Sequence, residues 1–228
     1  MGHLRALMAL LAAGLLCAAL AASASALEGG EPHEFIGNVT SEVSVVSSEQ
    51  ELNFAQVGIK CKGVKPVRTH KKTVFPALKI LVVFNFIKCK TGVTTLNNKT
   101  IAPSKARFGG PLEIEYSANG EPDATIVNSK EDPFTITFSG AMEGCTIAFL
   151  PNRPTDEALY SDAEVPAKNR KFFPTGIQEV VAIDNSFHKI AYTIGGGACV
   201  ELKKTEGKEG EFFGTLLAGL KTGDLSFE

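Results

Sequence analysis

Clustered positive charge is the most distinctive chemical pattern in this chain of 228 residues. The segment from Lys60 to Gly110 contains twelve Lys or Arg residues and no Asp or Glu. The twelve bases are Lys60, Lys62, Lys65, Arg68, Lys71, Lys72, Lys79, Lys88, Lys90, Lys99, Lys105 and Arg107. Acidic residues predominate elsewhere, so the formal net charge of the whole chain is only −2. Clustered Lys and Arg attract polyanions because they neutralise repeated negative charges and release counterions.

The basic segment therefore predicts a surface that binds an anionic cell-envelope or extracellular polymer. The candidate binding residues, where the bases are densest, are Lys65, Arg68, His70, Lys71 and Lys72. A second interpretation stays open, because neighbouring strands could pair these bases with acidic strands that contain Glu42, Glu113 and Glu115. Nucleic acid is not expected as a partner, because the chain is acidic overall and the phenylalanines of the segment lie in apolar runs.

The sequence patterns that could indicate catalysis or metal binding are either missing or lie in an unsuitable position. The chain lacks the G-x-S-x-G, H-E-x-x-H, P-loop and EF-hand motifs. Ser186-Phe187-His188-Lys189 fits S-x-x-K, but Ser186 falls in a predicted turn and not at the start of a helix. No two cysteines have the spacing of a zinc site, and the histidines are scattered. We therefore expect no catalytic residue, no metal and no cofactor.

Four cysteines remain once Cys17 is removed with a leader. An even number of cysteines in an oxidising compartment predicts two disulfides, and three pairings are possible. We prefer Cys61–Cys89 and Cys145–Cys199, because hairpins and adjacent strands often bring near neighbours together. Cys199 shares its strand phase with charged residues and not with apolar ones, so the second pairing stays open.

The first 26 residues have the pattern of a secretory signal peptide. Arg5 supplies the positive start, Ala6 to Ala21 form a short apolar stretch, and Ala22 to Ala26 offer small-residue cleavage sites. Residues 27–228 would then fold outside the reducing cytosol. We predict no membrane span in this mature part, because its longest apolar run is short and polar residues interrupt it.

Alternating apolar and polar residues predict strands through most of the mature chain. Leu112, Ile114 and Tyr116 alternate with glutamates, and similar patterns recur from Phe134 and from Cys145. Short strands with turn signals between them favour a single all-β domain over residues 27–228, sandwich-like with an Ig- or jelly-roll-like layout. A division of this domain near residues 151–176 stays open.

The C-terminal part resembles a meander whose turns lie at residues 184–186, 195–197 and 207–210. The expected strands are 177–183, 187–194, 199–205, 211–217 and 224–227. A short helical excursion is expected near 155–165, because Thr155 could cap a helix and Asp156-Glu157 suit its first turn.

The chain resembles a loose group of secreted β-rich actinobacterial proteins of unassigned function. The resemblance rests on an early strand at Phe35, Leu52-x-Phe54, Gly58-Ile59-Lys60-Cys61 and the closing strands from Gly210 to Thr215. The lysine-rich segment after Cys61 departs from that group. The resemblance implies a bacterial exported β domain and carries over no active site.

The sequence as a whole predicts a non-catalytic secreted or cell-surface β domain that binds an anionic polymer through residues 60–110. The alternative is a secreted hydrolase that acts on an extracellular polymer. The ligand and the oligomeric state do not follow from the sequence.

Overall fold

The computed structural model describes residues 33–37, 40–47, 49–54, 57–67, 71–92, 94–96, 99–118, 123–152, 158–173, 176–196, 199 and 206–228. Nearly all of these residues lie in strands or the connections between them, so the predicted all-β class is confirmed. The strands are β1 Phe35–Gly37, β2 Val43–Ser47, β3 Gln50–Phe54, β4 Val57–Cys61, β5 Gly63–Pro66, β6 Lys79–Ile87, β7 Cys89–Thr91, β8 Thr94–Leu96, β9 Lys99–Ile101, β10 Lys105–Gly109, β11 Leu112–Ser117, β12 Asp123–Ile126, β13 Thr135–Ser139, β14 Thr146–Phe149, β15 Ala158–Glu164, β16 Glu179–Gly195, β17 Glu206–Leu220 and β18 Leu225–Phe227. A single turn of 3₁₀ helix spans Arg170–Phe172.

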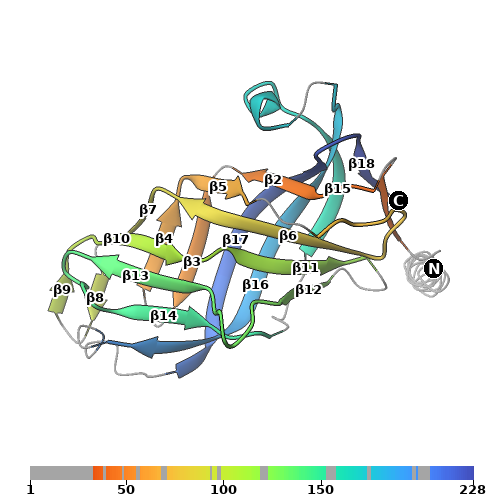
Figure 1. Ribbon diagram of the computed structural model, residues 1–228. Helices are drawn as coiled ribbons and strands as arrows, with labels where there is room; N and C mark the ends of the chain where they lie inside the picture. The colour runs from red at the N-terminus through yellow and green to blue at the C-terminus, as the bar shows by residue number, and fades with distance from the viewer. Residues whose placement is uncertain are drawn as a thin grey trace, which may run out of the picture. The chain divides into compact units, whose positions relative to one another are not determined.

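Eight strands close into a barrel. They pair in the order β16-β14-β13-β10-β7-β4-β3-β17, and pairing between β17 and β16 completes the ring. The two longest strands extend beyond the barrel, where β15 pairs with the first half of β16 and β2 with the last part of β17 (Figure 1). Closure leaves none of the eight with an unpaired edge along the ring, which removes the usual route to edge-to-edge association.

A second sheet of four strands packs against β16 and β17. Its order is β12-β11-β6-β5, and Figure 1 shows β6 and β11 crossing in front of β16 and β17. Phe212 of β17 lies 6.4 Å from Phe84 and 5.6 Å from Phe86, both in β6, measured between ring centroids. The four-stranded sheet and the barrel therefore share one hydrophobic core.

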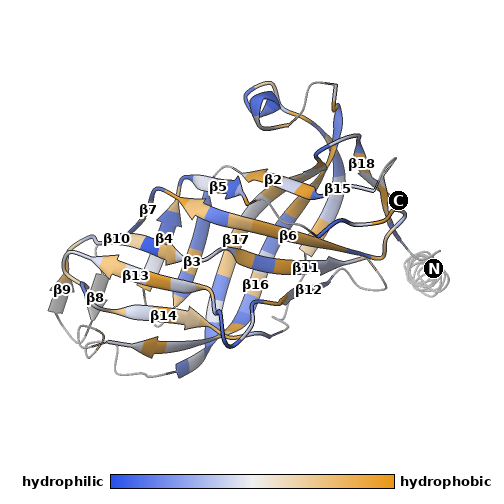
Figure 2. Cartoon of the chain, in the orientation of Figure 1, coloured by the Kyte–Doolittle hydropathy of each residue, from blue (hydrophilic) through white to orange (hydrophobic). Residues whose placement is uncertain are grey.

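Aromatic side chains fill this core. Phe54, Phe134 and Phe149 are fully buried, with ring centroids 4.7 Å apart for Phe54–Phe149 and 4.8 Å apart for Phe134–Phe149. Burying one such side chain contributes about 1.5–3 kcal/mol relative to leaving it exposed. Strand β6 is hydrophobic along most of its length (Figure 2), as expected for a strand with neighbours on both sides.

A buried polar link joins the second sheet to β16 and β17. The Tyr116 hydroxyl donates a hydrogen bond to Asn185 Oδ1 at 2.8 Å, and Asn185 Nδ2 donates to the Gly214 carbonyl at 2.9 Å. Both Tyr116 and Asn185 are buried. Leaving either group unpaired would cost about 1–3 kcal/mol, so the link orients the two layers.

Four expectations from the sequence are not confirmed in detail. The sandwich-like layout is not confirmed, because pairing between β16 and β17 closes the ring into a barrel. Residues 158–164 of the expected helix form β15 instead, whereas Thr155 to Glu157 lie outside the described residues. Pairing of β15 along seven residues of β16 supplies hydrogen bonds that override the local helical signal.

The expected turn at 184–186 is also absent, because β16 continues through it with Asn185 facing the core. Residues 207–210 belong to β17, where register shifts opposite β16 accommodate the glycines. Most of the expected strand 199–205 lies outside the described residues.

Both preferred disulfides are present. Cys61 bonds to Cys89 and Cys145 to Cys199. Cys199 sits beyond the end of β16, where its amide donates to the Gly196 carbonyl at 3.1 Å. The strand-phase objection to its pairing therefore does not apply.

Candidate anion-binding surface

Six of the twelve bases gather on three neighbouring strands of the barrel, with one pair on each of β4, β7 and β10 or directly beside it. We call them the outer basic patch. Its members are Lys60, Lys62, Lys88, Lys90, Lys105 and Arg107. All six are exposed, because they alternate along the strands with the buried residues Cys61, Cys89 and Ala106.

Strand register aligns three of these bases in one row. Lys90 is the direct cross-strand partner of both Lys60 and Lys105, which makes the first row. The other three bases lie beside this row: Arg107 is in β10, whereas Lys62 and Lys88 lie at the bends that join β4 to β5 and β6 to β7. Neighbouring strands lie about 4.8 Å apart and alternate residues about 7 Å apart, so the backbone positions of the patch span roughly 10 Å by 7 Å.

The positive charge of the patch is largely uncompensated. Lys60 lies 3.3 Å from the Glu51 carboxylate at one end of the first row. Within the described part of the chain, no acidic side chain forms an ion pair with the other five bases. Like charges on directly paired positions repel one another, so the patch is a site where a bound anion would relieve electrostatic cost.

The Cys61–Cys89 disulfide lies on the inner side of this patch. The strand register places the two cysteines opposite each other, each between two of the exposed lysines. The covalent link holds β4 and β7 together at the point where their outer lysines repel. The disulfide therefore keeps four of the six charges side by side.

Other bases of the segment are paired internally, as the second interpretation of the sequence expects. Lys79 lies 2.7 Å from Glu115, and Lys71 lies 3.6 Å from Glu113. Glu42, which was expected to pair with the segment, forms an ion pair with Lys221. Internal ion pairs therefore account for Lys71 and Lys79, whereas the outer basic patch remains available to bind an anion.

The structure does not gather the five binding residues expected from the sequence into one described site. Lys65 and Lys72 are exposed, and Lys71 pairs with Glu113. Arg68 and His70 lie outside the described residues. The expectation for this loop stays a prediction.

The outer basic patch was missed as a site because its members are dispersed over 48 positions, from Lys60 to Arg107, and meet only through strand pairing. A signal for four of its six members was available in the sequence. If Cys61 faces Cys89 inside a hairpin, the lysines on either side of each cysteine must face outward next to one another.

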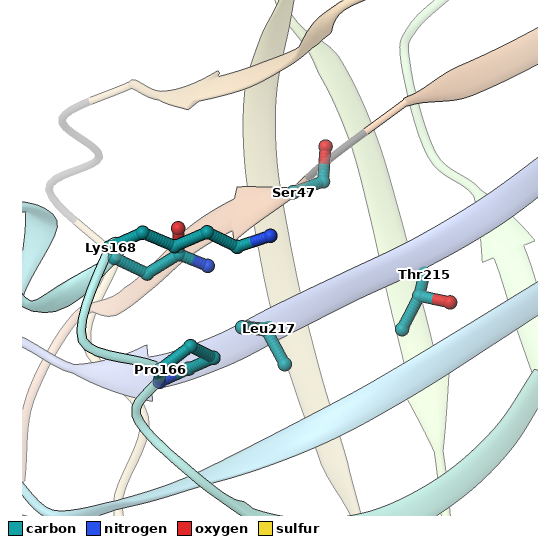
Figure 3. A pocket seen from close by; sticks show the side chains of 6 residues that line it. Ser47, Pro166, Lys168, Thr215 and Leu217 are labelled. Atoms are coloured by element: carbon teal, nitrogen blue, oxygen red, sulfur yellow. The ribbon is translucent and has the colours of Figure 1, made fainter.

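Two pockets lie elsewhere on the surface. One, of about 340 Å³, is lined by Ser47, Pro166, Lys168, Asn169, Thr215 and Leu217. Figure 3 shows the Lys168 side chain extending toward Ser47, and Lys168 is the one charged residue among the described residues that line this pocket. The second, of about 230 Å³, surrounds the Lys71–Glu113 ion pair.

A histidine and a carboxylate also meet on the barrel surface. His188 Nδ1 lies 3.1 Å from Glu211 Oε1, and Asn53 donates to the other oxygen of Glu211 at 3.2 Å. The His188 ring packs against Phe213. Cross-strand neighbours explain this group, and neither pocket described above includes any of its members.

Across the described ranges, no group of three or more His, Cys, Asp or Glu side chains is placed to hold a metal ion. No helix in the same ranges combines the length and the apolar character needed to cross a membrane. Comparisons with known proteins found no matching family, no similar curated protein and no similar solved structure.

Proposed function

We propose that this protein is a non-catalytic extracellular or cell-surface domain that binds an anionic polymer through its outer basic patch. The arrangement of Lys60, Lys90 and Lys105 in one cross-strand row, with three more exposed bases beside it, is the observation that supports the proposal. Fixed strands hold the charges in place, so binding an anion would require little reordering of the backbone.

The disulfides support the compartment assumed here. Two cystine bridges are consistent with an oxidising, extracellular location, because such bonds are rare in the reducing cytosol. The expected signal peptide at residues 1–26 lies outside the described residues. Export, and the resemblance to secreted actinobacterial proteins, remain parts of the proposal.

The hydrolase alternative has one observation in its favour, the contact between His188 and Glu211. A base of this kind needs a nucleophile or an activated water within hydrogen-bond reach and a substrate cleft around it. Neither of the two pockets described above includes His188 or Glu211. We therefore favour binding over catalysis.

Charge reversal tests the proposed function. The variant Lys90→Glu with Lys105→Glu should lose retention on a sulfated or phosphorylated polysaccharide column at low salt, because it replaces the middle and one end of the first row. The control Lys130→Glu with Lys208→Glu changes the net charge equally at exposed positions outside the patch and should elute like the parent protein. A third variant, Lys65→Glu with Lys72→Glu, tests the loop expected from the sequence.

Equal elution of the patch variant and the control would contradict the proposal. The parent protein should be retained at pH 7 although its formal net charge is −2, because local charge and not total charge governs contact with the column. Circular dichroism would show that each variant remains folded.

A further inference from the structure

We infer that the partner of the outer basic patch is a densely charged linear polyanion, one that carries sulfate or phosphate groups in close succession. This inference rests on the proposed function and narrows its ligand. It separates such chains from sparsely charged polysaccharides that carry one carboxylate on every second sugar.

The size of the patch carries the first step. Its six charges originate within roughly 10 Å by 7 Å of sheet. A polymer whose charges are spread far apart along its chain could place only one or two of them over such an area. A chain with closely spaced charges could neutralise most of the five lysines and the arginine at once, and it would release several condensed counterions.

The composition of the surrounding face carries the second step. Two residues away from the first row along the chain are two glycines, Gly58 in β4 and Gly92 directly after β7. A side chain added at Gly92 would meet no atom within 4 Å. At Gly58, an added Cβ would lie 3.1 Å from Asn53 Oδ1. The outward positions of β4 and β7 thus offer charge and small residues, with no aromatic ring on which a sugar or a nucleobase could stack.

The chemistry of the bases carries the third step. Five of the six are lysines, whose ammonium groups act as mobile point charges on flexible stems. Such groups adapt to a flexible chain with repeated anionic groups and impose little geometric selection on each one. We therefore expect the affinity of the patch for a polymer to depend on the charge density of the polymer and not on the identity of its sugar or linker.

Affinity measured against salt tests the inference. The mature protein is titrated with inorganic polyphosphate, dextran sulfate and hyaluronate, matched in the number of anionic groups per chain, between 50 and 200 mM salt (a range of roughly fourfold over which such contacts respond strongly). With six groups neutralised, the logarithm of the binding constant should fall against the logarithm of salt with a slope of about −4 for the two dense chains. The slope for hyaluronate should be near −1, or binding should be undetectable.

Neutral substitutions locate the effect. Lys90→Gln with Lys105→Gln should reduce the slope for the dense chains by about 1.4, because two ion contacts are lost. The control Lys130→Gln with Lys208→Gln should leave the slope unchanged. Comparable binding of polyphosphate and dextran sulfate supports charge density itself, and a preference for one identifies the anionic group while still supporting a dense chain.

Three outcomes would overturn the inference. Equal affinity and slope for hyaluronate and the dense chains would refute it but leave the proposed function standing. Tighter binding to phosphatidylglycerol vesicles than to any of the polymers would show a lipid surface to be the partner. Absence of binding to all four probes would refute both the inference and the proposed function.

Discussion

Two buried tyrosines link stability to pH at the residue scale. Burial raises the pKa of Tyr116 well above its ordinary value of 10.0; the nearby Tyr160 raises it further, and the hydrogen bond to Asn185 opposes the shift. Burial also raises the pKa of Tyr160, whose hydroxyl lies 2.9 Å from the Asp123 carbonyl. Both phenols stay protonated in the folded protein at a pH where the unfolded chain loses those protons.

We therefore expect stability to fall above about pH 10. Because the folded pKa values are raised, the contribution of each phenol is fully present below the unfolded pKa and is lost as the pH rises toward the folded value. The free energy of unfolding should decrease by about 1.4 kcal/mol per pH unit for each phenol, in addition to any change from lysine titration. Denaturant melts between pH 8 and pH 11 would measure this slope.

The Tyr160→Phe variant provides the control for this prediction. It removes one titrating phenol and should make the slope above pH 10 shallower by one proton. An unchanged slope in the variant would show that Tyr160 ionises equally in both states and would contradict the assignment.

Lys88 combines an unfavourable backbone conformation with a charge that belongs to the outer basic patch. Its φ of 53° lies in the left-handed region, which costs a non-glycine residue about 1–2 kcal/mol. Lys88→Gly should raise the free energy of unfolding by roughly 0.5–1 kcal/mol, after allowing for the greater flexibility of glycine in the unfolded chain. The same change should weaken binding to a dense polyanion, because the patch loses one charge.

Lys189→Gly is the matched control for Lys88→Gly. Lys189 has a φ of 56°, is exposed and lies outside the outer basic patch. It should give a similar gain in stability with no change in polyanion binding. Loss of binding in both variants, or in neither, would count against the role assigned to Lys88.

At the scale of elements, we expect both disulfides to stabilise the fold but only Cys61–Cys89 to affect polyanion binding. Cys61–Cys89 closes a loop with a sequence separation of 28 and Cys145–Cys199 one of 54, so the chain-entropy relation assigns them about 3.5 and 4 kcal/mol. Replacing either pair with serine should lower the midpoint of denaturant unfolding by similar amounts. Replacing Cys61 and Cys89 should also weaken polyanion binding, because repulsion between the lysines of β4 and β7 is then unopposed.

The Cys145→Ser with Cys199→Ser variant is the control for that second effect. It removes a disulfide of comparable stabilising power that bonds residues outside the three strands of the patch. Binding should persist in this variant at temperatures where it remains folded. Equal loss of binding in both variants would mean that general destabilisation, and not local strand pairing, explains the result.

At the scale of the whole molecule, charge separation follows from strand order. The basic strands β4, β7 and β10 are consecutive neighbours in the barrel, whereas Glu113 and Glu115 lie on β11 of the other sheet. These two glutamates neutralise Lys71 and Lys79 but do not reach the patch. The near-neutral total charge therefore conceals a one-sided distribution, which is what an anion-binding face requires.

The sequence predicted much of the local structure. Alternation located most strands, as with Leu112, Ile114 and Tyr116 of β11, and loop proximity favoured the correct disulfides. The prediction from sequence was wrong where the local structural preference of a residue was overridden by its contacts with distant parts of the chain. Asn185 has the character of a turn residue, yet its hydrogen bonds to Tyr116 and Gly214 place it inside a continuous strand.

For the candidate site, too, the sequence determined some features and the tertiary structure determined others. Composition along the chain determined that residues 60–110 are basic, and alternation around Cys61 and Cys89 determined that their lysine neighbours face away from the core. Which bases become neighbours was decided only by the tertiary structure, because β10 must close beside β7 before Lys105 and Arg107 join the patch. Strand pairing between distant segments depends on the packing of the entire core, and no local residue pattern records it.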